Sequence, residues 1–244
     1  IFGVDIDQNF PKAKSFLGVV AQEINFSQFE KVEDIVITQA GFYGIPKEAA
    51  KLRCRNLLEK LSLWDKRKDQ ARNLSGGQKR RLMIAKALVH EPKLLILDEP
   101  TAGVDIELRR EMWDFLSDIN KKGTTIILTT HYLEEAEQHC NNIAIIDEGA
   151  IVEDTSMKEL LSRLSIQSFV LDLEDDIQEL PDISIFDLKS QDSKTLIATL
   201  TKDDDLNTLF NKLTDHGIKV KSMRNEQNRL EELFIRLVKD KDGN

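Results

Sequence analysis

Long apolar runs are missing from this 244-residue sequence, and none approaches the roughly 18 residues that a membrane-spanning helix needs. The first residues also lack the basic, apolar and small-residue zones of a secretory signal peptide. Cysteine is scarce, and Cys54 and Cys140 form no CxxC or zinc-ligand spacing, which is typical of reduced thiols in a cytosolic protein. We therefore expect a soluble, cytoplasmic chain.

A surplus of basic residues is missing as well. The chain has 34 lysines and arginines against 43 aspartates and glutamates, a formal net charge of -9. Proteins that hold nucleic acid by its phosphates usually carry a basic surplus, so we expect no nucleic-acid partner. With 41 % hydrophobic residues, the chain can bury a full core and has room for one large domain and one small one.

Short apolar runs alternate with helical patterns over the first part of the chain. The predicted strands are residues 15–22, 94–97, 124–130 and 143–147. Helical patterns cover residues 31–72, the segment between Gln78 and Pro92, residues 106–121 and a short stretch after residue 131. Continuous apolar strands separated by helices are typical of a parallel sheet covered on both faces, so the sequence predicts a doubly wound α/β fold.

The pattern changes after about residue 160. A Gly-centred turn in DEGAIVED, residues 147–154, predicts a hairpin that closes the edge of the first domain. The later strand candidates are residues 169–173, 183–188, 195–200 and 218–223, with a helix near 205–215 and a final helix over 228–240 whose apolar stripe is Leu230, Leu233, Phe234 and Leu237. We therefore expect a first domain at 1–160 and a small α+β domain at 161–244.

Polar side chains stand where three of the predicted strands end. Gln22 follows the first strand, Asp98 and Glu99 follow the second, and His131 follows the third. Ligands of doubly wound sheets bind beyond the carboxyl ends of the strands. Because successive side chains of an extended chain point to opposite sides, Asp98 and Glu99 should have different tasks. A magnesium ion suits Asp98, directly or through water, Glu99 could orient or deprotonate an attacking water, and His131 could meet the transferred phosphate.

A second candidate site is the turn LSGGQ, residues 74–78, which opens a helix. Its glycines let backbone N–H groups approach an anion, and the positive end of the helix dipole adds to the attraction. Taken singly, each of these signals also has an ordinary reading as a helix cap, a solvated turn or a structural histidine. The combination decides, because LSGGQ, LLILDEP, TAGVD and TTH follow one another in an order that makes chance agreement very unlikely.

These segments resemble the nucleotide-binding domain of ABC transporters. LSGGQ is similar to the ABC signature, ILDEP at 96–100 to the Walker B strand, and TAGVD at 101–105 to the D-loop. The resemblance implies a P-loop-NTPase-like parallel sheet with a helical signature subdomain at about residues 30–90. It also implies that the protein binds ATP and Mg²⁺ and hydrolyses ATP.

The resemblance further implies a role for each motif residue. Glu99 corresponds to the catalytic base, and Asp98 to the residue that binds magnesium through water, with Gln22 as a second metal contact. His131, as the switch histidine, and Gln22, in the Q-loop, sense the γ-phosphate. In a head-to-tail dimer, the signature meets the ATP that is held mainly by the opposite subunit. The implied cofactor-binding residues are Ser75, Gly76, Gly77, Gln78 and Asp105, with Ser75 and Gly77 at the γ-phosphate and Asp105 along the dimer seam.

The C-terminal segment NRLEELFIRLV is similar to the end of ABC-2-type exporter ATPases. That resemblance implies a separate integral-membrane permease as partner and a position on the inner face of the cell membrane. Residues 31–64, with the aromatic side chains of Phe42, Tyr43 and Trp64, are then the expected docking segment for the permease. The reading of each aromatic residue as ordinary core has equal weight.

The P-loop motif G-x-x-x-x-G-K-[ST] is missing, since none of the eleven glycines is followed by lysine. Its lysine and loop amides hold the phosphates, and its hydroxyl holds magnesium. We expect a fragment of a normal ATPase, because Glu99 and His131 are both intact. The alternative is a P-loop-less binding or regulatory module that completes the site of a partner ATPase without hydrolysing ATP itself.

Overall fold

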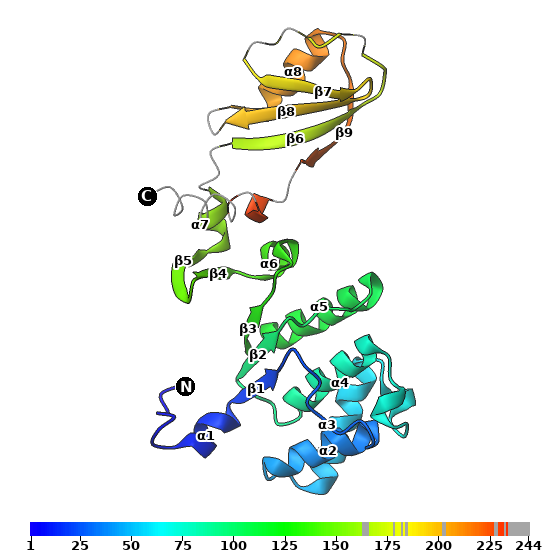
Figure 1. Ribbon diagram of the computed structural model, residues 1–244, viewed down its shortest axis with the longest axis vertical. Helices are drawn as coiled ribbons and strands as arrows, with labels where there is room; N and C mark the ends of the chain where they lie inside the picture. Colours follow the sequence, from blue (N-terminus) through cyan, green and yellow to red (C-terminus); the bar gives the residue numbers. More distant parts are fainter. Residues whose placement is uncertain are drawn as a thin grey trace. The chain divides into compact units, whose positions relative to one another are not determined.

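The computed structural model describes residues 1–162, 166–177, 179–181, 183, 185–201, 204–226, 229–231 and 233 (Figure 1). The chain divides into two compact units, residues 1–131 and 132–244. These units differ from the expected domains, 1–160 and 161–244, which stay a prediction.

The first unit combines a parallel sheet with helices, which confirms the predicted α/β fold. Its strands are β1 (Leu17–Val20), β2 (Leu94–Asp98) and β3 (Thr125–Thr129), and they lie in the order β1-β2-β3. Its α-helices are α1 (Phe10–Ser15), α2 (Val32–Phe42), α3 (Lys47–Lys60), α4 (Gly76–Leu88) and α5 (Ile106–Lys121), with single 3₁₀ turns at Trp64–Lys66 and Ala71–Asn73. Helix α5 has the predicted bounds, because Asp105 caps its first turn.

The register of the sheet brings the ends of its strands level. Val20 of β1 lies opposite Leu97 of β2, and Leu97 lies opposite Leu128 of β3, all in parallel pairing. Val20 and Leu97 are fully buried and fix this register through the core. The residues that follow the strands therefore emerge at one edge of the sheet.

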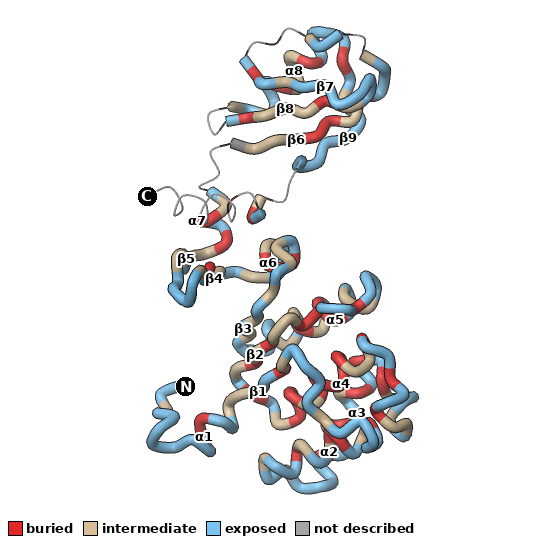
Figure 2. Tube along the Cα trace, viewed as in Figure 1, coloured by how far each residue is buried: buried red, intermediate tan, exposed pale blue. Residues whose placement is uncertain are grey.

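The three α-helices between β1 and β2 pack on one another around a shared core, seen as the buried segments of α2, α3 and α4 in Figure 2. Ala50, Leu57, Leu61 and Trp64 stand at helix-like intervals in the sequence. In the structure, α3 ends at Lys60 and buries residues spaced four apart, while Leu57 and Trp64 are only half-buried. The buried residues of α3 are Ala50, Cys54 and Leu58.

Gly18 allows β1 to approach the end of α4. A Cβ atom built on Gly18 lies 2.5 Å from the carbonyl oxygen of Ala87 and 2.9 Å from Cγ of Pro92. We predict that Gly18→Ala lowers the free energy of unfolding of the first unit by about 1–3 kcal/mol, because the backbone must move to admit the methyl group. Chemical denaturation followed by tryptophan fluorescence measures this change.

The matched control is Gly41→Ala in α2, where an added Cβ meets nothing within 4 Å. This variant should gain about 0.5–1 kcal/mol, since alanine favours the helix over glycine. A Gly18→Ala protein as stable as the wild type would contradict the close approach of β1 and α4.

The second unit contains a hairpin and an antiparallel sheet. Its elements are α6 (Leu133–His139), β4 (Asn142–Asp147), β5 (Ala150–Ser156), α7 (Met157–Ser162), β6 (Ile166–Leu173), β7 (Asp187–Asp192), β8 (Thr195–Thr201), α8 (Leu206–Asp215) and β9 (Val220–Asn225). The order β7-β8-β6-β9 and helix α8, which buries Leu209 and Leu213 against that sheet, confirm the predicted α+β character of the C-terminal part.

Two strand predictions for this unit need correction. The run at 143–147 was expected in the parallel sheet, but β4 pairs antiparallel with β5. The reason is the predicted hairpin turn, where Glu148 and Gly149 both have positive φ and return the chain at once. The run at 183–188 becomes strand only from Asp187, because the buried Ile183 and Phe186 belong to a turn before β7.

The predicted C-terminal helix is described only at its start. Leu230 and Leu233 are buried in a cluster with Ile145, Met157 and Leu160. Phe234 and Leu237 of the predicted stripe lie outside the described residues. Within the described ranges, no helix combines the length and the apolar character that crossing a membrane requires.

Candidate active site

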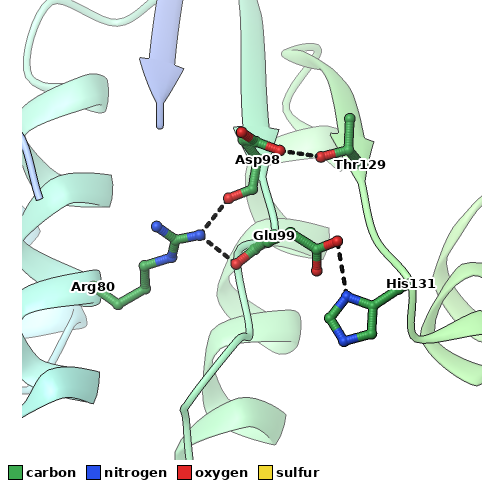
Figure 3. Close-up of polar contacts among 5 residues, drawn as sticks. All are labelled: Arg80, Asp98, Glu99, Thr129 and His131. Atoms are coloured by element: carbon green, nitrogen blue, oxygen red, sulfur yellow. Dashed lines mark hydrogen bonds and ion pairs between the residues drawn. The ribbon is translucent and has the colours of Figure 1, made fainter. Parts of the chain in front are cut away.

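Polar residues from two neighbouring strands meet at the carboxyl edge of the parallel sheet (Figure 3). Asp98 is the last residue of β2, and its Oδ1 accepts a hydrogen bond from the hydroxyl of Thr129 at the end of β3. Glu99 follows directly, and its backbone N–H donates to the carbonyl oxygen of Thr129 at 3.1 Å. The side chain of Glu99 reaches His131, with 2.9 Å between Oε1 and Nδ1. The structure thus joins three of the predicted residues.

The two adjacent carboxylates have different partners because the backbone turns between them. Glu99 has a φ of 49°, in the left-handed region that favours glycine. Such a conformation costs another residue about 1–3 kcal/mol and persists only where the surroundings hold it. It directs the Glu99 carboxylate toward His131 while the Asp98 carboxylate faces Thr129 (Figure 3). In an extended chain, alternation alone would place the two carboxylates on opposite sides. The left-handed turn at Glu99 decides where its carboxylate points, which is toward His131.

The carboxylate of Glu99 is mostly buried. Its side chain is 16 % exposed, and its Oε2 atom is buried without a hydrogen-bond partner in the described part of the chain. A buried carboxylate oxygen without a donor favours the approach of one, such as a water molecule. His131 fixes the other oxygen, and its ring is 65 % exposed, so the pair opens to solvent on the histidine side.

Arg80 is a site residue that the sequence analysis missed. It lies on α4, and its guanidinium donates to backbone carbonyl oxygens after β1 and at the end of β2, including those of Gln22, Asp98 and Glu99. Burial lowers the pKa of Arg80, and the nearby carboxylates of Asp98 and Glu99 oppose that shift. The signal in the sequence was the pair Arg80 and Arg81 inside a helix whose other residues are mostly apolar. Gln22 itself meets this cluster through its backbone, and its side chain is exposed.

The signature turn forms the N-terminal cap of α4. The hydroxyl of Ser75 accepts from the backbone N–H of Gln78 at 3.3 Å, and Oε1 of Gln78 accepts from the backbone N–H of Ser75 at 2.9 Å. This reciprocal capping box gives both side chains a structural task. Ser75 and Gly76 are exposed, and a Cβ on Gly76 would meet nothing within 4 Å.

The D-loop packs against the signature turn of the same chain. A Cβ atom built on the buried Gly77 lies 3.7 Å from Cδ1 of Leu108 and 3.9 Å from Cγ1 of Val104. Asp105 caps α5, since its Oδ1 accepts from the backbone N–H of Leu108 at 3.0 Å. The signature and the D-loop therefore form one local group, and Asp98, Glu99 and His131 form another.

The donor atoms at Asp98 fit magnesium. A carboxylate beside the Thr129 hydroxyl offers the hard oxygen ligands that Mg²⁺ prefers. Within the described ranges, no cluster of three or more His, Cys, Asp or Glu side chains is placed to hold a metal. A magnesium ion here needs further oxygen ligands, and nucleotide phosphates commonly supply them.

The parallel sheet with its helices defines an α/β protein whose polar strand ends form a candidate site at the carboxyl edge of the sheet. A family model described as "ABC transporter" matches residues 1–102. The linearmycin resistance ATP-binding protein LnrL of Bacillus subtilis (strain 168) is 32 % identical over 243 residues, which cover 96 % of this chain and 78 % of that protein. The chain therefore belongs to the family of ABC transporter ATP-binding proteins, as the motifs predicted.

Other relatives agree with this assignment. The Nod factor export ATP-binding protein I of Cupriavidus metallidurans is 39 % identical over 160 residues, 65 % of this chain and 52 % of that protein. A solved structure described as the ATP binding subunit of an ABC transporter superposes with a TM-score of 0.61 at 23 % identity, and covers 66 % of this chain and 67 % of that one. The chain thus spans about half the length of the Nod factor protein, and the solved structure supports the fold alone.

Proposed function

We propose that this protein is the ATP-binding and ATP-hydrolysing subunit of an ABC-2-type exporter, which couples hydrolysis to transport through a separate permease. The observation that carries the proposal is the contact of Glu99 with His131 beside Asp98, at one edge of the sheet. The names of the relatives support an exporter, because one confers linearmycin resistance and another serves Nod factor export.

Each residue at the sheet edge has a part in the proposed hydrolysis. Glu99 accepts a proton from the attacking water, while His131 holds Oε1 and lies ready for the γ-phosphate. Asp98 and Gln22 would hold Mg²⁺, which would supply positive charge to neutralise the phosphate oxygens. A positioned base of this kind contributes about two to four orders of magnitude in rate.

The proposed working unit is a head-to-tail dimer with a second ATPase subunit. Ser75, Gly76, Gly77 and Gln78 meet the ATP of the opposite subunit, and the exposed Asp105 lies along the seam. The exposure of Ser75 and Gly76 at the positive end of α4 supports this proposal, because that end of a helix attracts phosphate. ATP then closes the dimer and hydrolysis reopens it, which moves the permease between two states.

The proposed docking segment for the permease is residues 31–64, within a helical signature subdomain at about 30–90. Of its three aromatic residues, Phe42 is 80 % exposed, whereas Tyr43 stacks on His90 with ring centroids 3.6 Å apart. The ring of Trp64 lies under the guanidinium groups of two arginines. Phe42 is thus the best candidate contact. Docking there would hold the protein, with its ATPase domain at 1–160 and accessory domain at 161–244, at the inner face of the cell membrane.

Phosphate release tests the proposal in the protein produced from its complete reading frame. We expect hydrolysis of ATP that needs Mg²⁺ and stops when EDTA removes it, because the carboxylate at Asp98 would then face the phosphates without a cation between them. Phosphate release that is indifferent to EDTA would contradict the magnesium role of Asp98. No release above the blank would contradict hydrolysis itself.

A second candidate is a binding or regulatory module that completes a partner's site with Ser75 and Gly77. The observation in its favour is that no glycine among the 244 residues is followed by lysine. Equilibrium dialysis of the protein produced from its complete reading frame with magnesium ATP separates the two candidates. A module should retain no nucleotide by itself but increase retention by an ATPase partner, whereas a hydrolysing subunit should retain it alone.

A further inference from the structure

The side chain of Arg80 forms hydrogen bonds with the backbone of two separate turns. The residue is 6 % exposed and sits in the second turn of α4. Its Nη1 donates to the carbonyl oxygen of Ala21 at 2.6 Å and to that of Gln22 at 3.1 Å. Its Nε donates to the carbonyl oxygen of Pro100 at 3.1 Å, and its Nη2 donates to those of Asp98 and Glu99. The turn after β1 and the turn after β2 therefore share one guanidinium.

The chemistry of arginine explains why this residue type stands here. A guanidinium carries five N–H donors in a rigid plane, so it can fix several acceptors in one arrangement. Four of the five carbonyl oxygens that Arg80 contacts belong to residues that follow β1 or β2, and partly buried acceptors of this kind need donors. Arg80 supplies these donors from α4, and so ties the helix to both turns.

Glu99 is the residue most dependent on this arrangement. Its left-handed backbone is held by its own N–H on Thr129 and by two donors on its carbonyl oxygen, the N–H of Ala102 at 3.2 Å and Nη2 of Arg80. Without the Arg80 contact, the backbone can relax toward the regions that residues other than glycine prefer. Such a change of φ would swing the carboxylate away from His131.

We propose that Arg80 is a positioning residue for ATP hydrolysis, which holds the backbone of Glu99 and of Gln22 so that the Glu99 carboxylate stays aligned with His131. This inference rests on the hydrolytic function proposed above. It assigns to Arg80 a task beyond packing α4, since the loss of its contacts should misplace the base more than it weakens nucleotide binding. A misplacement of about 1 Å can reduce a rate about 100-fold.

Arg81 offers a matched comparison on the same helix. It is 5 % exposed, and its Nη1 donates to the carbonyl oxygen of Leu61 at 2.7 Å, in the turn that ends α3. Burial lowers the pKa of both arginines, so removal of either changes a similarly desolvated cation. Of the two arginines, only Arg80 donates hydrogen bonds to residues at the ends of β1 and β2 within the described part of the chain. A general effect of losing a buried arginine should therefore appear in both variants.

The experiment compares Arg80→Gln and Arg80→Lys with Arg81→Gln and Arg81→Lys in the protein produced from its complete reading frame. Steady-state hydrolysis gives kcat and KM for ATP, and hydrogen exchange by mass spectrometry follows peptides that contain residues 20–23 and 98–102. For Arg80→Gln we expect kcat to fall about 100-fold with little change in KM, and both peptides to exchange faster. Arg80→Lys should recover part of kcat, because an ammonium group can still donate to some of the carbonyl oxygens.

The Arg81 variants should unfold at lower temperature but keep kcat and the exchange of both peptides. The proposal is overturned if Arg80→Gln keeps wild-type kcat, if its 98–102 peptide exchanges as in the wild type, or if Arg81→Gln shows the same losses. If Arg80→Gln does not fold, Arg80→Lys decides by the same criteria. A wild-type protein that hydrolyses no ATP refutes the proposed function. In that case, hydrogen exchange of the two peptides still tests whether Arg80 holds the two turns.

Discussion

Glu99→Gln should lower the rate of ATP hydrolysis by about two to four orders of magnitude, the usual contribution of a positioned general base. The amide has nearly the shape of the carboxylate but cannot take the proton of the attacking water. Nucleotide binding should persist, because the predicted contacts to magnesium and phosphate come from other residues. Single-turnover phosphate release and equilibrium binding of magnesium ATP, measured on the same preparation, separate the two effects.

Asp114→Asn is the control for this change. Asp114 lies on the exposed face of α5, so the same conversion of a carboxylate to an amide should leave hydrolysis at the wild-type rate. If Glu99→Gln hydrolyses ATP as fast as Asp114→Asn does, Glu99 is not the base. The contact with His131 would then be a structural ion pair only.

Leu97→Ala should be the most destabilising of the proposed substitutions. Leu97 is fully buried in the central strand of the sheet and stands opposite Val20 and Leu128. Its truncation removes buried methyl groups and leaves a cavity, which typically costs about 2–5 kcal/mol of unfolding free energy. Both tryptophans, Trp64 and Trp113, belong to the first unit, so fluorescence during urea denaturation reports on that unit.

The comparison variant is Leu52→Ala on α3, where the leucine is 63 % exposed. It should change the free energy of unfolding by no more than about 0.5 kcal/mol, as surface substitutions usually do. Equal stabilities of the two variants would mean that Leu97 does not lie in the core. The register of the sheet, which places the strand ends at one edge, would then be contradicted as well.

The sequence alone predicted the parts of the site that depend on local pattern. The apolar run at 94–97 and the run at 124–130 are both strands, and their parallel pairing follows from the helix between them. Because parallel strands end at the same edge, the positions of Glu99 and His131 in the chain were enough to predict that they lie close together. The helical pattern over residues 106–121 likewise predicted the bounds of α5.

The parts that the sequence could not predict depend on contacts between distant segments. The hydrogen bond from Arg80 to Ala21 joins residues 59 positions apart, and a run of basic residues on a helix is usually a solvated face. The left-handed backbone of Glu99 has no signature either, since glycine or asparagine would be the expected residue there. The pairing of β4 was missed because a short apolar run in the sequence fits a parallel strand and a hairpin strand equally well.

We propose that Gln22, Asp98, Glu99 and His131 surround one nucleotide site. A crystal structure of the protein from its complete reading frame, with Glu99→Gln and magnesium ATP, tests this claim most directly. We predict oxygen atoms of Asp98 and Gln22 around the magnesium ion, His131 at the γ-phosphate, and Ser75 of a second copy on the opposite side of the same phosphate. ATP bound away from these side chains would contradict the account.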